Sequence, residues 1–164
     1  MCFKYVLSIG SNIEPKLDNL IRALKELSAY GEIIERSSIY KTEPWGKKDQ
    51  SDFFNAAIKF NSRRAPLDLM TIIKNIEKKM GRKKTHRWGE RIIDIDILFA
   101  DDLVIDEVDL KIPHRLMAER KFVLAPLAEL TEDFHLPHFL KTANEILHEC
   151  SDSAIVEKLP LDWE

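Results

Sequence analysis

Two kinds of hydrophobic periodicity alternate along the chain and predict alternating strands and helices. Residues 3–10 alternate apolar with small or polar side chains and end at a glycine, which is the pattern of a strand. In residues 15–30, leucines and isoleucines recur every three or four positions, which predicts an amphipathic helix. Pro15 suits the first turn of that helix and Gly31 suits its end.

The same alternation continues through the middle of the chain. Residues 32–42 and 53–62 are predicted strands, with a polar loop between them. Residues 66–80 are a predicted helix, and residues 92–100 are a further strand. The order strand, helix, strand, strand, helix, strand predicts the ferredoxin-like split βαβ arrangement. This is an α+β sandwich in which helices pack on one face of a mostly antiparallel sheet.

The C-terminal third adds to this arrangement. Residues 101–114 have the pattern of a short hairpin, residues 115–130 begin as a helix, and residues 142–151 form a last helix. With 164 residues the chain is long enough to bury a sizeable core, so we expect residues 1–164 to form a single catalytic domain.

Composition narrows the class of protein. The net charge of −3 gives no reason to expect a nucleic acid or a membrane as partner. No apolar run approaches the roughly 20 residues of a membrane span, and the N-terminus lacks a cleavable signal pattern. Cys2 and Cys150 are far apart and are expected to be reduced thiols, which predicts a cytoplasmic protein.

Two aspartates, Asp94 and Asp96, interrupt the apolar strand at 92–100. Side chains alternate between the faces of a strand, so the two carboxylates share one face about 7 Å apart, and the isoleucines and Phe99 share the other. Carboxylates at this spacing repel each other unless a cation lies between them. Mg²⁺ takes one or two carboxylates and completes its shell with water and phosphates. The pair predicts a Mg²⁺ site, although such aspartates can also simply face water.

A strongly basic segment precedes the aspartates. Residues 78–91 hold seven lysines and arginines and one glutamate, a net charge of +6, so the rest of the chain carries −9. Such a run is typical of a solvated loop. Beside metal-binding acids, however, flexible cations form a site for a polyphosphate. The sequence contains neither of the common glycine-rich ATP-binding motifs.

Two further groups of residues suit a flat heterocycle and an anion. Trp45, Phe53 and Asn55 bring aromatic faces and an amide together, and such groups can bind a flat polar ring, although Phe53 can equally be a core residue. His114 follows a proline and is close to Arg115 and Arg120 in sequence. A single histidine is commonly structural, but the arginines allow a phosphate or nucleotide contact.

Five stretches together carry a family pattern, with R-W-G-x-R-x-x-D-x-D-I and a later Pro-His as its most specific part. They are SIGSN at 8–12, SSIYKTEPWG at 37–46, DQSDFFNAA at 49–57, RWGERIIDIDILF at 87–99 and IPHRLMAERKFVLAPL at 112–127. Over nearly its whole length the chain resembles the 6-hydroxymethyl-7,8-dihydropterin pyrophosphokinases of folate biosynthesis.

The resemblance implies a reaction and its residues. Pyrophosphate would pass as one unit from MgATP to the pterin hydroxymethyl group and leave AMP. Asp94 and Asp96 would hold two Mg²⁺ ions, and Arg82 and Arg91 would act with them on the triphosphate. Residues implied at the nucleotide are Glu77, Lys84, Trp88, Arg91, Ile97, His114, Arg115 and Arg120. Residues implied at the pterin are Thr42, Pro44, Trp45, Phe53, Asn55, Trp88, Asp94 and Phe122.

No residue is an obvious strong base, so catalysis is expected to rest on positioning and charge neutralisation. ATP and the pterin are the expected partners of a monomeric enzyme. Lys83 and Lys84 stand where many family members have an arginine. Lysine is a point charge and not a bidentate fork, so which of them replaces that contact is left open. Glu90 and Arg115 stand where the family often has proline and tyrosine.

Two other functions can use the same residues. A metal-dependent phosphohydrolase or nuclease would use the aspartates without a pterin acceptor. A ferredoxin-like RNA-binding module would use the basic segment and Trp88, but the aspartates would repel an RNA backbone.

Overall fold

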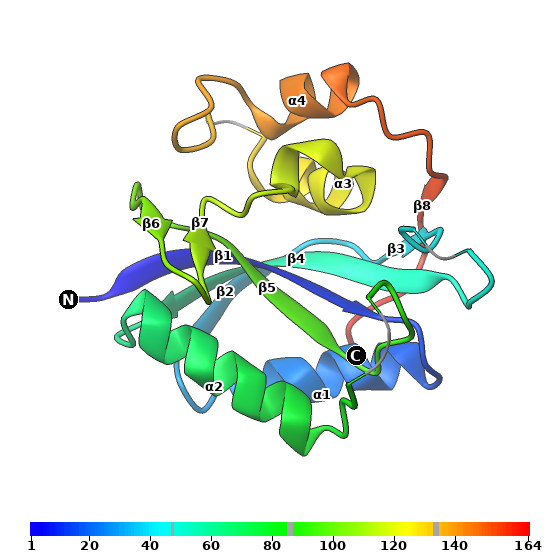
Figure 1. The fold of residues 1–164 in the computed structure, drawn as a ribbon, viewed down its shortest axis with the longest axis horizontal. Helices are drawn as coiled ribbons and strands as arrows, with labels where there is room; N and C mark the ends of the chain where they lie inside the picture. The colour runs from blue at the N-terminus through cyan, green and yellow to red at the C-terminus, as the bar shows by residue number, and fades with distance from the viewer. Residues whose placement is uncertain (47, 85–86, 133–134) are drawn as a thin grey trace.

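The computed structural model describes residues 1–46, 48–84, 87–132 and 135–164, and Figure 1 shows its ribbon. In chain order its elements are β1 (Phe3–Ser11), α1 (Lys16–Leu27), β2 (Glu32–Arg36), β3 (Tyr40–Thr42), β4 (Phe53–Ser62), α2 (Pro66–Lys79), β5 (Asp94–Ala100), β6 (Ile105–Asp106), β7 (Lys111–Ile112), the 3₁₀ turn η1 (Met117–Glu119), α3 (Lys121–Leu130), α4 (Ala143–Glu149) and β8 (Val156–Lys158).

One sheet of six strands organises the described part of the chain. Its order is β5-β1-β4-β3-β8, and β2 pairs with β4 next to β3. Each of these pairings is antiparallel. With β1 and β4 in the centre and α1 and α2 as the connecting helices, the ferredoxin-like α+β prediction is confirmed. The predicted hairpin is also present, as β6 paired with β7.

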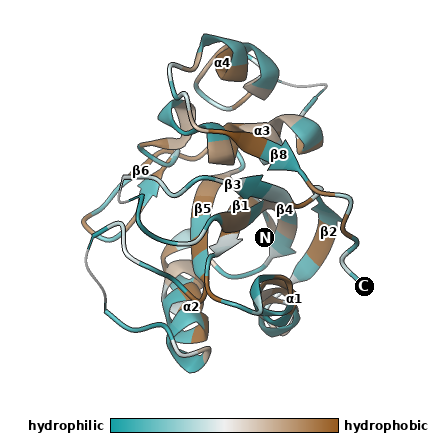
Figure 2. Cartoon of the chain, turned by 90° about the vertical axis from the view of Figure 1, so that its right-hand side faces the viewer, coloured by the Kyte–Doolittle hydropathy of each residue, from teal (hydrophilic) through white to brown (hydrophobic). Residues whose placement is uncertain are grey.

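Helices cover both faces of the sheet. The prediction that they cover only one face is wrong. In Figure 1, α1 and α2 lie below the sheet, and α3 lies above it with α4 stacked outside α3. Figure 2 shows the same layers from the side, with apolar residues on α3 between the sheet and α4. The reason is the composition of α3: six of its ten residues are buried, among them Leu124 and Leu127. A helix that is apolar on most sides packs between two layers.

Three local features differ from the predicted elements. The β-like run at 32–42 is two strands, because Ser37–Ile39 interrupt the regular pairing with β4 between β2 and β3, although Ser37 still bonds to Ala57. In β5, Val6 pairs with Phe99 but Leu7 pairs with Ile97, so one extra residue breaks the alternation that was predicted to continue through Phe99. The strand β8 was not predicted, because three residues are too few to show a period.

The core lies mainly between the sheet and α1 and α2. Ile95 of β5 and Leu7 and Ile9 of β1 are fully buried with Leu20 of α1 and Ile73 of α2. This packing fixes the orientation of β5, and the aspartates that alternate with its isoleucines then point to the opposite face. Within the described residues, no helix has the length and apolar character needed to cross a bilayer.

Candidate active site

A cavity of about 610 Å³ opens at the end of the sheet where β1 and β3 finish and β4 and β5 begin. The β6–β7 hairpin, the segment before β5 and the start of α3 contribute to its wall. It brings together thirteen of the seventeen predicted site residues: Thr42, Trp45, Phe53, Asn55, Trp88, Arg91, Asp94, Asp96, Ile97, His114, Arg115, Arg120 and Phe122.

The register of the sheet shows which strand positions Asp94, Asp96 and Asn55 occupy relative to one another. Gly10 of β1 pairs with Asp94 on one side and with Asn55 on the other, while Ser8 pairs with Asp96. Directly opposed residues share a face, and neighbouring strands are about 4.8 Å apart. Asp94 and Asn55 therefore point to the same face with one strand between them, about 10 Å apart.

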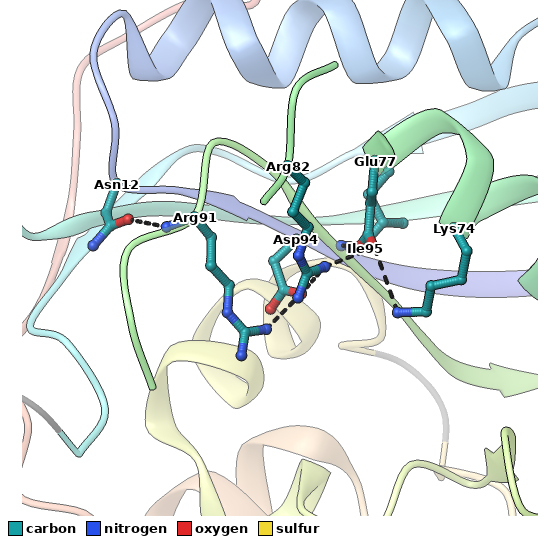
Figure 3. A network of polar contacts seen from close by, with 7 residues as sticks. All are labelled: Asn12, Lys74, Glu77, Arg82, Arg91, Asp94 and Ile95. Atoms are coloured by element: carbon teal, nitrogen blue, oxygen red, sulfur yellow. Dashed lines mark hydrogen bonds and ion pairs between the residues drawn. The ribbon is translucent and has the colours of Figure 1, made fainter. Parts of the chain in front are cut away.

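Two arginines converge on Asp94. Arg82 and Arg91 each place a guanidinium nitrogen on Oδ1 of Asp94, at 3.0 and 2.9 Å (Figure 3). Burial and then the negative charge of Asp94 raise the pKa of Asp96 to about 7, against the opposing effects of Lys74 and Arg120. Asp94 is thus neutralised by two arginines, whereas burial beside Asp94 disfavours the charged form of Asp96.

Glu77 is a predicted nucleotide residue, but it does not line the cavity. Its carboxylate is almost fully buried, accepts the backbone N–H of Ile95 at 2.9 Å and lies 2.6 Å from Arg82. Lys74 is 3.4 Å away (Figure 3). Burial raises the pKa of Glu77, and its bond to Ile95 lowers it. The physical role of Glu77 is therefore to tie α2 to β5 and to hold Arg82 toward Asp94.

Three other predicted residues lie outside the cavity wall. Arg82 stands behind Asp94, held between that carboxylate and Glu77. Lys84 is exposed to solvent, and Pro44 is buried beside the wall. Thr85 and His86 of the basic segment lie outside the described residues.

An arginine occupies the space between three aromatic rings. The guanidinium carbon of Arg120 is 5.3 Å from the ring centre of Trp88, 5.6 Å from that of Trp45 and 5.7 Å from that of Phe122. Its Nε is buried and has no hydrogen-bond partner among the described residues. Burial lowers the pKa of Arg120. A buried donor without a partner is costly, so this group is suited to an acceptor on a ligand.

His114 is placed as a neutral side chain. Its Nδ1 accepts the backbone N–H of Leu116 at 3.2 Å. Burial, and then the charge of Arg120, lower the pKa of His114. At pH 7 the imidazole is uncharged and its Nε2 is the proton-bearing nitrogen.

The cavity also contains residues that the sequence patterns did not indicate. Lys74 of α2 and Lys111 of β7 line the wall. A single lysine on a helix or a hairpin is usually an ordinary surface residue, so only the fold shows that these two line a cavity. Asn12, in the SIGSN stretch, is buried beside the cavity.

The carboxylates of Asp94 and Asp96 suit a metal ion whose other ligands are water and substrate phosphates. Within the parts of the chain that are described, no three His, Cys, Asp or Glu side chains are gathered to hold an ion. Asp94 and Asp96 offer a hard cation two carboxylates beside a cationic wall. This donor set fits Mg²⁺, which keeps several waters and binds substrate phosphates, better than it fits a metal that needs four protein ligands.

Comparison with known proteins decides the family. Residues 6–132 match the family described as 7,8-dihydro-6-hydroxymethylpterin-pyrophosphokinase (HPPK). The chain belongs to this family. It is 35% identical over 156 residues to a 2-amino-4-hydroxy-6-hydroxymethyldihydropteridine pyrophosphokinase of Haemophilus influenzae, a match that covers 94% of the chain and 97% of that relative. An HPPK of Methylorubrum extorquens is 40% identical over 129 residues, covering 77% of the chain and 82% of the relative.

Other similar proteins are longer than this HPPK chain. A folic acid synthesis protein of Dictyostelium discoideum is 37% identical over 154 residues, and the chain, matched over 94% of its length, spans 23% of that protein. Among solved structures, Plasmodium falciparum HPPK-DHPS with pterin and p-hydroxybenzoate matches 91% of this chain and 42% of its own, with a TM-score of 0.72 and 20% identity. That likeness shows a common fold.

Proposed function

We propose that the chain transfers pyrophosphate from ATP to the hydroxymethyl group of 6-hydroxymethyl-7,8-dihydropterin, which yields the pterin diphosphate and AMP for folate synthesis. The observation that carries this proposal is the row formed by Asp94, Gly10 and Asn55. In this row a carboxylate, proposed to act at the phosphates, and an amide, proposed to bind the heterocycle, share one face of one cavity. Membership of the HPPK family supports the same reaction.

On the phosphate side, Asp94 and Asp96 would hold Mg²⁺, and we expect two ions. Bound metal would neutralise the phosphate oxygens and polarise the transferred group. Arg82 and Arg91, which both contact Asp94, can exchange that carboxylate for phosphate oxygens. Guanidinium groups suit this exchange because they bind carboxylate and phosphate with the same forked geometry.

On the pterin side, Asn55 is held by Thr42, which lies diagonally opposite it on β3. Its Nδ2 donates to Oγ1 of Thr42 at 2.6 Å, which leaves its Oδ1 and second N–H to read a heterocycle edge. Trp45, Trp88 and Phe122 supply aromatic faces, and the Nε of Arg120 lies between them without a partner. Lys84 and Arg115, both exposed, are proposed to contact the nucleotide from the rim, and Glu77 acts through Arg82.

Gly10 provides the room in which the Asn55 amide lies. A Cβ at residue 10 would be 2.2 Å from Oδ1 of Asn55, closer than any real contact. We expect Gly10→Ala to displace the amide and weaken pterin binding by about tenfold or more, because a lost hydrogen bond to a buried polar group costs about 1–3 kcal/mol. Titration of tryptophan fluorescence with pterin measures it. Affinity for an ATP analogue in the same variant is the control and should change little, and an unchanged pterin affinity would contradict the role given to Asn55.

We further propose that residues 1–164 act as one catalytic domain, as a monomer in the cytoplasm. The described helices pack on one six-stranded sheet and contribute to a continuous core, which supports one domain. Sedimentation analysis at micromolar concentration tests the monomer.

The identity of the nucleotide product tests the proposed function. With ATP, Mg²⁺ and the pterin, we expect AMP to form in a 1:1 ratio with pterin consumed, and little AMP to form when the pterin is left out. The phosphohydrolase alternative instead gives nucleotide or phosphate release without the pterin. Formation of ADP with the pterin present, or turnover unaffected by EDTA, would overturn the proposal.

A further inference from the structure

A buried amide connects the two walls of the cavity. Asn12, at the end of β1, is 2% exposed and lies between a segment 38 residues later and one 79 residues later. Its Nδ2 donates to Oε1 of Gln50 at 2.9 Å and to the backbone oxygen of Ser51 at 3.1 Å. Its Oδ1 accepts the backbone N–H of Arg91 at 2.8 Å. Both donor hydrogens and the acceptor of this side chain are therefore in use.

The contact with Arg91 is made twice. The backbone N–H of Asn12 also donates to the carbonyl of Arg91, at 3.1 Å. The main chain at Arg91 is thus fixed on both sides, three residues before Asp94, and its guanidinium lies on that aspartate (Figure 3). A shift of the backbone at Arg91 would move this guanidinium away from the position at which it meets the phosphates.

The contact with Gln50 extends to the aromatic wall. The Nε2 of Gln50 donates to the carbonyl of Trp88. Trp88 has a φ of 67°, in the left-handed region that side-chain-bearing residues rarely adopt. Gly46 lies against its ring, where a Cβ would be 2.9 Å from Cγ of Trp88. Residues 48–52 and 87–91 are therefore joined through one chain of bonds, Asn12 to Gln50 to Trp88.

We propose that Asn12 is a positioning residue for the transfer step. It holds the backbone of Arg91 so that the guanidinium points to Asp94. Through Gln50 it also holds the backbone of Trp88 beside the proposed pterin site. The distance between the phosphate site and the acceptor site is thereby kept constant. The proposal rests on the proposed function. It assigns Asn12 no contact with substrate, and its effect should appear mainly in kcat, because alignment matters most in the transition state.

The test compares Asn12→Ala with Asn19→Ala. Asn19 is an equally buried amide, which donates to the Ile13 carbonyl at 2.8 Å and to Ser11 within the β1–α1 turn. We expect Asn12→Ala to lower kcat by about 10²-fold, with the affinity for an ATP analogue within about threefold of wild type. Asn19→Ala should lower the melting temperature to a similar degree and keep most of the wild-type kcat.

Two further readouts separate positioning from a general loss of structure. In the protein without substrates, amide hydrogen exchange should lose protection at Arg91 in Asn12→Ala, and not in Asn19→Ala. Gln50→Ala should lower kcat less than Asn12→Ala, and the double variant should be no slower than Asn12→Ala alone, because both act through one chain of bonds.

The outcomes distinguish this inference from the function on which it rests. If wild-type protein forms no AMP with ATP and the pterin, the proposed function fails, while the exchange measurement still tests the link to Arg91. If wild type is active and Asn12→Ala matches Asn19→Ala in kcat, the positioning role is wrong. Equal losses in kcat and in ATP-analogue affinity would also overturn it, because they indicate general damage to the site.

Discussion

Asp96→Asn should remove pyrophosphoryl transfer, lowering kcat by at least about 10³-fold, because the metal would lose one of its two carboxylates and several kcal/mol of transition-state stabilisation with it. The variant should nevertheless remain folded, since asparagine has the same shape as aspartate. Activity is measured as AMP formation with the pterin and saturating Mg²⁺. Activity within tenfold of wild type would contradict the role of Asp96 as a metal ligand.

Asp96 gives the stability of the wild-type chain a pH dependence of known sign, which Asp96→Asn should remove. Burial and Asp94 raise the pKa of Asp96 to about 7 in the folded chain, so the folded chain binds this proton more tightly than the unfolded chain does. The contribution to stability is present below about pH 4 and is lost as the pH rises through 7. In EDTA at pH 8, Asp96→Asn should therefore melt at the same temperature as wild type or higher. The control is Asp102→Asn, an exposed aspartate in the turn after β5, which should leave both activity and melting temperature unchanged.

Arg91→Ala should lower kcat by about 10³-fold or more, the range found for arginines that stabilise a transferring phosphoryl group. Arg91 reaches Asp94 at 2.9 Å and lines the cavity, so its guanidinium is within reach of a metal-bound phosphate. Arg91→Lys should recover part of the loss, because it returns the charge without the fork. A kcat within threefold of wild type in Arg91→Ala would show that the charge near Asp94 does not serve the reaction.

The two arginines should differ in what they do to stability. Arg82→Ala removes the 2.6 Å partner of the buried Glu77 and leaves that carboxylate with Lys74 and the Ile95 N–H. Arg91→Ala leaves Asp94 paired with Arg82. Loss of a buried ion-pair partner costs about 3–5 kcal/mol, so Arg82→Ala should lower the melting temperature well below that of Arg91→Ala. Equal melting temperatures would contradict the structural role assigned to Glu77.

Much of the fold could be predicted because periodicity of two and of 3.6 residues reflects burial directly. The strand at 53–62 has the predicted bounds, and the alternation of Asp94 and Asp96 with isoleucine placed both acids on the cavity face. Local pattern could not indicate partners that lie far apart in sequence. Residues 156–158 form the strand β8 only because they pair with β3. The face of the sheet on which α3 lies is decided by tertiary packing.

Some of the site residues could likewise be recognised in the sequence, and others only in the fold. Side chains whose chemistry is unusual for their context could be recognised in sequence: acids in an apolar strand, and tryptophan in a polar loop. Glu77 could be placed only near the nucleotide, since nothing in a helical glutamate reveals that it is buried against β5. Asn12 and Gln50 are ordinary amides in sequence, and their link exists only because the fold brings three segments together.

The most direct test of the account follows the γ-phosphate of ATP into its product. With ATP labelled in the γ-phosphate, Mg²⁺ and the hydroxymethyl pterin, the label should appear in a pterin diphosphate, together with an equal amount of AMP. This is the result expected if one cavity, with Asp94 and Asn55 on one face, aligns the acceptor with the β-phosphorus. Label found in a pterin monophosphate with ADP, or in free phosphate without any pterin product, would contradict it.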